Sequence, residues 1–313
     1  MNQRSDRGDH TSTLCISVVI PTADRPQTIG PAIQKIFANT VQPYEVIVID
    51  QSRTDRTLKA LSSFIQAGKI TYLQDTGLGV SRARNVGWRK ASGEIIAFTD
   101  DDAHTDLHWL ENVRQTFERS DLNIGVLGGK IIPFYEQKNP DWSIPKRWEY
   151  LLPAYDQGDT LSLYEGTSLP AGVNYSIYRS LLEKFDGFDE DLGPNLSRNL
   201  QIYGEDADLA RRISQNGFSL VYNPNCVVYH PVPLSRQNQN FLNKRLISEG
   251  ATFAFMQIKS SNLGKDLVSL SKSFIRYSNF VLQGKDTDEL YYLRGKILVL
   301  LKCGLFKQPP NSL

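Results

Sequence analysis

The sequence is poor in cysteine and has almost no excess charge. Its 313 residues include only three cysteines, Cys15, Cys226 and Cys303, and no CxxC pair. This spacing argues against a zinc site and fits a reducing compartment, so we predict a cytoplasmic protein. The 35 basic side chains nearly balance the 34 acidic ones, which leaves a net charge of +1. A nucleic-acid-binding protein is expected to be strongly basic, so we predict no nucleic-acid partner.

Long apolar runs are also missing. No stretch approaches the ~20 apolar residues that a membrane-spanning helix requires. Residues 1–14 are polar and lack the apolar core of a signal peptide, and we predict a disordered tail there. With 40% hydrophobic and 22% charged residues, the remaining chain has the composition of a globular protein.

Short β-branched runs alternate with helical patterns along much of the chain, which indicates a parallel sheet with crossover helices. Continuous apolar strands such as "VIVI" indicate burial on both faces of that sheet. Residues 133–170 are less regular and suggest a binding loop or lid. The predicted strands cover residues 15–22, 44–50, 69–74, 94–99, 123–131 and 218–230, the last of them interrupted at Pro224.

The pattern becomes helical from Gln237 to about Cys303, with an interruption around residues 283–289. The final segment, "LRGKILVLLKCGLFKQPP", alternates leucine-rich and lysine positions. Two interpretations remain open for it. It forms either a basic amphipathic helix that contacts a membrane surface peripherally, or a helix that packs on the main domain.

Three consecutive aspartates, Asp100, Asp101 and Asp102, follow the apolar strand "EIIAFT". Ligands bind at the carboxyl ends of strands in open α/β sheets. Adjacent carboxylates repel one another unless a cation lies among them, and hard oxygen ligands suit Mn²⁺ or Mg²⁺. The alternative is a solvated turn that caps the next helix.

A glycine-rich, basic segment precedes these aspartates. Gly77 and Gly79 come just before a predicted helix, whose N-terminal amide groups attract phosphate, and Arg82 and Arg84 add charge that can bind a diphosphate. A dinucleotide-binding GxGxxG motif would need glycine at position 82. The segment therefore favours a nucleotide diphosphate over a nicotinamide cofactor.

Four blocks in this order resemble the GT-A fold glycosyltransferases of family 2, inverting enzymes that use nucleotide-diphosphate sugars. The resemblance covers about residues 15–230. It implies an α/β fold with a Rossmann-like mixed central sheet flanked by helices over residues 15–235, and a C-terminal helical extension over 236–313. The blocks are "SVVIPTADRPQTI", "EVIVIDQS", "GVSRARNVGWRKASGEIIAFTDDD" and "YGEDADLARRISQNGF".

The resemblance also implies roles on the donor side. Asp100 would contact the ribose, while Asp102 would bind the Mn²⁺ or Mg²⁺ that bridges the diphosphate, with His230 as a further metal ligand. Three aspartates in a row leave this register ambiguous by one, so Asp101 also fits a share in the metal. The residues assigned to donor binding are Thr22, Asp50, Arg84, Asp100 and Asp101.

On the acceptor side, the resemblance places the general base in the pair Glu205 and Asp206. We predict Asp206 as the base, because an inverting transfer needs a carboxylate that takes the proton of the attacking hydroxyl. Glu205, Gly172 and Asn174 are predicted to lie beside the acceptor. The alternative is that the two acidic residues only favour the positive end of the helix they begin.

Two features depart from the family or narrow the activity. Asp24 stands where the family commonly has asparagine, and no processive Q/RxxRW signature follows Asp206. We therefore predict transfer of single sugars to a saccharide or lipid-linked saccharide of a cell-surface polysaccharide or glycolipid, at the inner face of the cytoplasmic membrane. A nucleotidyltransferase and a nucleotide-sugar-binding protein without catalysis are the alternatives.

Overall fold

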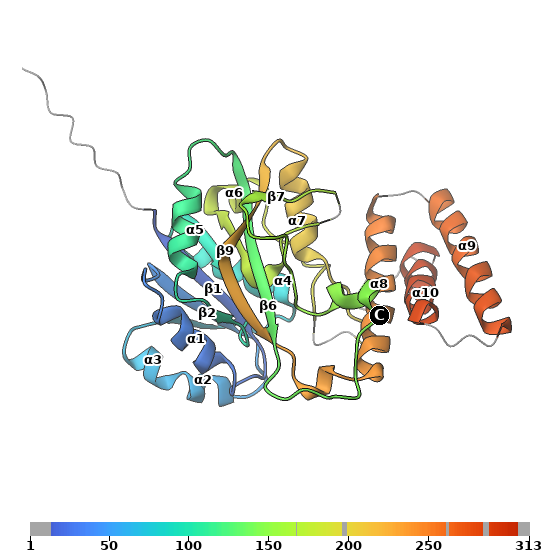
Figure 1. Ribbon diagram of the computed structural model, residues 1–313, viewed down its shortest axis with the longest axis horizontal. Coiled ribbons are helices and arrows are strands. Elements are labelled where there is room, and N and C mark those ends of the chain that lie inside the picture. Colours follow the sequence, from blue (N-terminus) through green and yellow to red (C-terminus); the bar gives the residue numbers. More distant parts are fainter. Residues whose placement is uncertain (1–13, 167, 196–198, 261–262, 284–287, 306–313) are drawn as a thin grey trace, which may run out of the picture.

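The structure is a computed structural model that describes residues 14–166, 168–195, 199–260, 263–283 and 288–305. The predicted disordered tail lies, apart from Leu14, outside the described residues. A central sheet with helices around it is joined to a group of C-terminal helices (Figure 1). This arrangement confirms the α/β fold class and the helical C-terminal part.

One mixed sheet forms the centre of the described chain. Its strands are β1 (Ile16–Thr22), β2 (Glu45–Asp50), β3 (Thr71–Gln74), β4 (Ile95–Phe98), β5 (His104–Thr105), β6 (Ile124–Phe134), β7 (Ser162–Leu163), β8 (Tyr175–Tyr178) and β9 (Ser219–Pro231). Their order is β3-β2-β1-β4-β8-β6-β9-β5, and β7 pairs with β9. Strands β1 to β4 are parallel, whereas β8 runs antiparallel to both β4 and β6. The sheet is thus mixed, as predicted.

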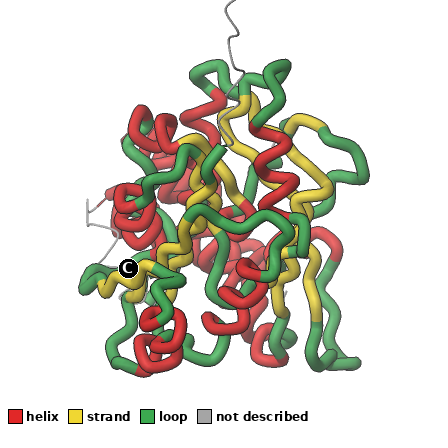
Figure 2. The backbone as a smooth tube through the Cα atoms, turned by 90° about the vertical axis from the view of Figure 1, so that its left-hand side faces the viewer, coloured by secondary structure: helices red, strands yellow, loops and turns green. Residues whose placement is uncertain are grey.

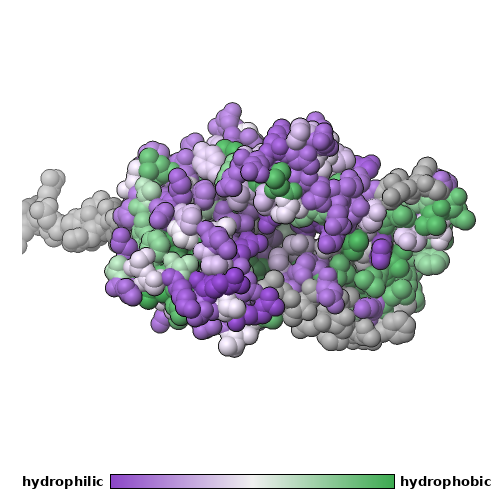
Figure 3. All heavy atoms as spheres, turned by 90° about the horizontal axis from the view of Figure 1, so that it is seen from below, coloured by the Kyte–Doolittle hydropathy of each residue, from purple (hydrophilic) through white to green (hydrophobic). Residues whose placement is uncertain are grey.

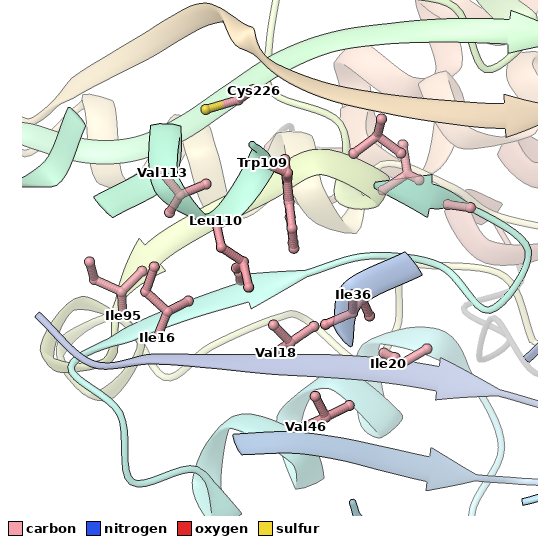
Figure 4. Packing of buried hydrophobic residues seen from close by; sticks show 14 of the residues in the cluster. Ile16, Val18, Ile20, Ile36, Val46, Ile95, Trp109, Leu110, Val113 and Cys226 are labelled. Carbon is pink, nitrogen blue, oxygen red and sulfur yellow. The ribbon is translucent and has the colours of Figure 1, made fainter. Parts of the chain in front are cut away.

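Helices pack around this sheet (Figure 2). On β1, Val18 and Ile20 lie in the same buried cluster as side chains of α1 and α5, whereas Val19 lies in the cluster that holds side chains of α4 (Figure 4). Alternate side chains of one strand are therefore buried on opposite faces, as the continuous apolar run predicts. These helices are α1 (Ile29–Phe37), α2 (Arg56–Ala60), α3 (Ser62–Gln66), α4 (Val80–Lys90), α5 (Trp109–Phe117), α6 (Arg179–Lys184) and α7 (Glu205–Ser214), with 3₁₀ turns η1 (Lys146–Leu151), η2 (Gly172–Asn174) and η3 (Leu234–Arg236).

Strand β9 is not interrupted at Pro224, so that detail of the sequence prediction is wrong. The strand continues from Ser219 to Pro231. Its pairing with β6 nevertheless shifts, from Gly129 opposite Asn223 to Ile131 opposite Val228. Proline has no N–H to donate to a ladder, and a bulge accommodates it without ending the strand.

The C-terminal helices are α8 (Gln239–Ser260), α9 (Leu263–Leu282) and α10 (Asp288–Val299), followed by the π-helical turn η4 (Leu300–Leu305). Gly250 of α8 and Gly295 of α10 allow these two helices to pack closely, because a Cβ at either position would collide with the backbone of the other helix. Val299, Leu300 and Cys303 are buried in a cluster with Ala251 and Phe255 of α8 and with Leu192, Leu200 and Ile202.

The leucine-rich final segment therefore packs inward through Val299, Leu300 and Cys303. Its buried side chains join α8 to the segment that precedes α7. This favours the second of the two interpretations of the sequence, a helix that packs on the main domain. Among the described helices, none combines the length and the hydropathy that crossing a bilayer would need.

Candidate active site

The acidic triplet lies where the sequence predicts, at the carboxyl end of β4. This strand pairs in parallel with β1, and His230 is the next-to-last residue of β9. Asp101 and Asp102 are buried, whereas the side chain of Asp100 is 32% exposed. The triplet is therefore not a solvated turn.

Asp100, Asp102 and His230 form a cluster with the geometry of a metal site. Each offers a ligand atom, and these atoms all lie within 4.8 Å of one another. His230 Nε2 is 3.4 Å from Asp102 Oδ1 and 3.8 Å from Asp100 Oδ2. Asp101 faces elsewhere, because the Thr22 hydroxyl donates to its Oδ2 at 2.6 Å.

The orientation of His230 presents its Nε2 to the two carboxylates. Its Nδ1 lies 3.1 Å from the Pro231 carbonyl oxygen, which can only accept, so Nδ1 carries a proton and Nε2 faces the carboxylates. Burial lowers the pKa of His230, but the charges of Asp100 and Asp102 outweigh this and raise it. Asp102 Oδ1 is buried without a hydrogen-bond partner. A divalent ion between these atoms would satisfy all three, and two carboxylates with an imidazole suit Mn²⁺ or Mg²⁺.

Two arginines border the cluster, and the sequence analysis assigned a role to neither. Arg25 Nη1 lies 2.9 Å from Asp101 Oδ1 and 3.0 Å from Asp102 Oδ2. Arg236 Nη2 lies 3.8 Å from Asp102 Oδ2. Burial raises the pKa of Asp101 to about 6 even though Arg25 and Thr22 oppose the shift. The sequence contains a signal for the role of Arg25, because this residue comes shortly after β1 in the block "PTADR". For Arg236 it contains none beyond the position of this residue after the last strand.

The backbone conformation of Asp24, the residue before Arg25, explains why aspartate can stand where the family commonly has asparagine. Asp24 has φ +55°, in the left-handed region. Aspartate and asparagine tolerate this conformation better than other non-glycine residues. Its backbone N–H donates to Ser52 Oγ at 2.7 Å, which ties the loop after β1 to the end of β2.

Arg84 connects the triplet with the second acidic pair. Its Nη1 donates to Glu205 Oε1 at 2.7 Å and its Nη2 to Asp100 Oδ1 at 3.3 Å, and the side chain is only 3% exposed. Burial would raise the pKa of Asp100, but His230 and Arg84 lower it to about 2. Burial and the neighbouring Asp206 raise the pKa of Glu205 to about 7, against the opposing charge of Arg84.

Asp206 differs from Glu205 in being partly exposed. Its Oδ2 accepts the backbone N–H of Gly172 at 2.7 Å, and its Oδ1 accepts that of Ala207 at 2.7 Å. A Cβ at Gly172 would lie 2.5 Å from Arg84 Nη2. Only glycine therefore lets η2 approach both Arg84 and Asp206 this closely.

The structure does not support an acceptor-side role for Asn174. Its side chain is buried, and its Nδ2 donates to the carbonyl oxygens of Cys226 at 2.7 Å and Lys130 at 3.2 Å. Its Oδ1 accepts from Trp109 Nε1 at 3.0 Å. Because these bonds use both N–H donors, Asn174 holds η2 against β6, β9 and α5, a role that the sequence pattern alone does not reveal.

Asp50 lies at the carboxyl end of β2, opposite Thr22 in the parallel ladder. It is buried, and its oxygens accept from the Tyr72 hydroxyl at 2.6 Å and the Ser52 N–H at 2.8 Å. Its contact with a base or ribose stays a prediction. Arg82 pairs instead with Asp75, at 3.0 Å.

Comparison with known proteins agrees with this geometry. Residues 17–185, more than half of the chain, match the model of glycosyl transferase family 2. The chain is 23% identical over 247 residues to the glucosyl-dolichyl phosphate glucuronosyltransferase of Haloferax volcanii, covering 78% of this chain and 77% of that protein.

Two solved structures share the fold. The mannosyltransferase PcManGT from Pyrobaculum calidifontis, in complex with GDP-Man and Mn²⁺, superimposes with a TM-score of 0.59 at 17% identity, covering 95% of this chain and 88% of that one. GalNAc-T7 with UDP, GalNAc and Mn²⁺ gives a TM-score of 0.55 at 17% identity over 76% of this chain, which spans 48% of that protein. The chain belongs to glycosyl transferase family 2, has the GT-A fold, and is a glycosyltransferase.

Proposed function

We propose that this glycosyltransferase moves a single sugar from a nucleotide-diphosphate sugar to a hydroxyl acceptor, with inversion and with a bound divalent metal. The observation that carries the proposal is the Arg84 bridge, which joins Asp100 of the metal-site cluster to Glu205, the neighbour of Asp206. One edge of the sheet thus holds both a cation site and a carboxylate base, as a displacement at an anomeric carbon requires.

On the donor side, Asp102 and His230 would hold the metal, with Asp100 beside them. A bound Mn²⁺ or Mg²⁺ would neutralise the charge that develops on the leaving diphosphate. Arg25 and Arg236 lie against the same carboxylates and add positive charge where the diphosphate would bind. Thr22, Asp50, Arg84 and Asp101 are the remaining donor-side assignments. The Mn²⁺ and GDP-Man in the Pyrobaculum structure support this assignment.

On the acceptor side, we assign the general base to Asp206. Glu205 is committed to the buried pair with Arg84, and its pKa is raised to about 7. Asp206 is partly exposed, and Gly172 N–H holds it in place. A carboxylate that is held in orientation but reaches solvent can accept the proton of an incoming hydroxyl.

For the acceptor we propose a saccharide linked to a polyprenyl or dolichyl phosphate, used in cell-surface polysaccharide or glycolipid synthesis. The Haloferax relative is named for a glucosyl-dolichyl phosphate acceptor. Such an acceptor would place the enzyme peripherally at the cytoplasmic face of the membrane. We assign the transfer chemistry to residues 15–235, joined by Arg236 at the start of the extension, and treat 236–313 as the extension.

Thermal unfolding with UDP, GDP and dTDP, each with Mn²⁺ or with EDTA, tests the donor half of this proposal. A ligand that binds only the folded state at a hundred times its Kd adds about 2.7 kcal/mol of stability. We expect this gain for one diphosphate, only with Mn²⁺, and its loss in Asp102→Ala. Glu111→Ala, a change of a partly exposed carboxylate on α5, should leave the gain intact. No gain with any diphosphate would contradict the proposal.

A further inference from the structure

Helix α9 leaves an apolar face uncovered. Pairs of exposed hydrophobic side chains recur along it every seven residues, or about two helical turns, so they lie on one side. We call these residues the α9 apolar face: Leu267, Val268, Phe274, Ile275, Val281 and Leu282, between 45% and 85% exposed. Figure 3 shows hydrophobic residues gathered over the C-terminal helices at its right-hand end, beside a mostly hydrophilic surface. Contiguous exposed apolar surface of this kind indicates an interaction site.

A basic cleft of about 270 Å³ lies beside this face, between α8, α9 and α10. Lys272 and Arg276 of α9 and Lys296 of α10 line it, and the carboxylate among its lining residues is Glu289. Arg276 pairs with Glu289, so three cations against one carboxylate leave an excess charge of +2. Burial and the charge of Arg276 lower the pKa of Lys296, as expected where positive charge is incompletely compensated.

A second copy of the chain is a poor occupant for this surface. Between Leu267 and Leu282, α9 contains Lys272 and Arg276 and no acidic residue. These cations lie near the middle of the helix, so a two-fold pairing of two α9 faces would bring like charges together. An anionic lipid surface has the opposite properties: its headgroups complement the cations, and its acyl region accepts the apolar side chains.

We propose that the α9 apolar face and the basic cleft dock this protein on a membrane that carries anionic lipids, with lipid phosphate groups bound by Lys272, Arg276 and Lys296. The docking surface rests on the membrane location in the proposed function and names the residues that would provide it, while its test does not depend on the transfer chemistry. This surface takes the place of the leucine-rich segment after Arg294 as the proposed membrane contact. The described apolar side chains of that segment are largely packed inside the protein.

Helix α8, which lines the cleft through Phe253, contacts the segment that leads into Glu205 and Asp206. Thr252 Oγ1 of α8 accepts the backbone N–H of Tyr203 at 2.8 Å, and the Arg245 guanidinium lies 3.5 Å from the centre of the Tyr203 ring. Tyr203 precedes Gly204, Glu205 and Asp206. Docking through α9 and the cleft would therefore be linked to the acceptor side of the site through α8.

Flotation of the full chain with vesicles tests the docking surface. We expect binding to vesicles of phosphatidylcholine with phosphatidylglycerol, and much weaker binding to phosphatidylcholine alone or at high salt. The double change Phe274→Ser with Ile275→Ser should lower binding at least ~tenfold, because it removes apolar area that enters the acyl region. Lys272→Glu should lower binding to the anionic vesicles several-fold.

Matched controls are Leu58→Ser and Lys90→Glu, exposed positions on α2 and α4, which should leave flotation unchanged. Equal vesicle binding by wild type and the Phe274/Ile275 variant would overturn the proposal. It would also be overturned if wild type bound no vesicles and light scattering showed wild type to be a dimer and this variant a monomer. The same variant should keep its stabilisation by nucleotide diphosphate and Mn²⁺. If wild type shows vesicle binding without that stabilisation, the proposed function fails and the docking surface stands.

Discussion

The carboxyl edge of the sheet and the outer side of α9 differ in which side chains they bury. Charged side chains are buried at the sheet edge, whereas apolar side chains are exposed on α9. At the sheet edge, Arg84, Asp101, Asp102 and Glu205 are all at most 8% exposed. On α9, the six side chains of the apolar face are at least 45% exposed. Burying charge is unfavourable unless the charge is paired, and exposing apolar surface gives up the hydrophobic contribution of those side chains.

This difference indicates what kind of ligand or surface each region would bind. At the sheet edge Asp102 Oδ1 is buried with no hydrogen-bond donor, and the cation that we propose there would compensate its charge. On α9 the matching surface would be apolar, with a negatively charged border to match Lys272 and Arg276. The interior between these regions, such as the Val18 and Ile20 cluster, shows ordinary burial of apolar side chains.

The largest effect expected at the sheet edge is on catalysis. Asp206→Asn should lower sugar transfer ~10²–10⁴-fold, because it removes the group that accepts the acceptor's proton. Stabilisation by the donor diphosphate should remain, since the cation site is untouched. Transfer to a lipid-linked acceptor, assayed with the donor that thermal unfolding identifies, measures the loss. Asp208→Asn, two residues further along α7, is the control, and an equal loss there would refute the assignment.

A smaller effect is expected on stability when the buried ion pair is broken. Arg84→Ala should lower the free energy of unfolding by about 3 kcal/mol, because Glu205 then stays buried beside Asp206 without a counter-charge. Adding Glu205→Gln should recover part of this loss by removing the unpaired charge. Denaturant titration measures both. Arg89→Ala, a change of an exposed arginine on the same helix, should cost at most about 1 kcal/mol. A similar cost for the two arginines would mean that the buried ion pair contributes no more to stability than an exposed one.

The smallest effect on stability is expected on α9. Phe274→Ser with Ile275→Ser should change the free energy of unfolding by no more than about 0.5 kcal/mol, because the fold does not cover these side chains. Leu246→Ala, fully buried on α8, should cost about 2–5 kcal/mol. A comparable loss from the α9 variant in the same titration would show that its apolar face is part of the core, and the contrast between the two regions would disappear.

Much of the GT-A domain could be read from the sequence. Strands β1, β2 and β4 carry short, continuous apolar runs, and the triplet follows β4 after Thr99 alone, so its place at the sheet edge was predictable. The C-terminal helices were predictable as helices, because their patterns are long. Their orientation was not, since leucines at helical spacing look the same whether they face a core or a membrane.

The sequence by itself determined the order of strands and helices, the motif residues and the family, because these depend on local patterns and on the spacing of chemically distinctive residues. The tertiary structure alone decided which residues meet. It brought Arg25 and Arg236 to Asp102 from positions 77 residues before and 134 residues after it, gave Asn174 a structural role, and turned α9 outward instead of the final helix. Contacts between distant segments follow from how helices pack on the sheet and on one another, and no local pattern in the chain records them.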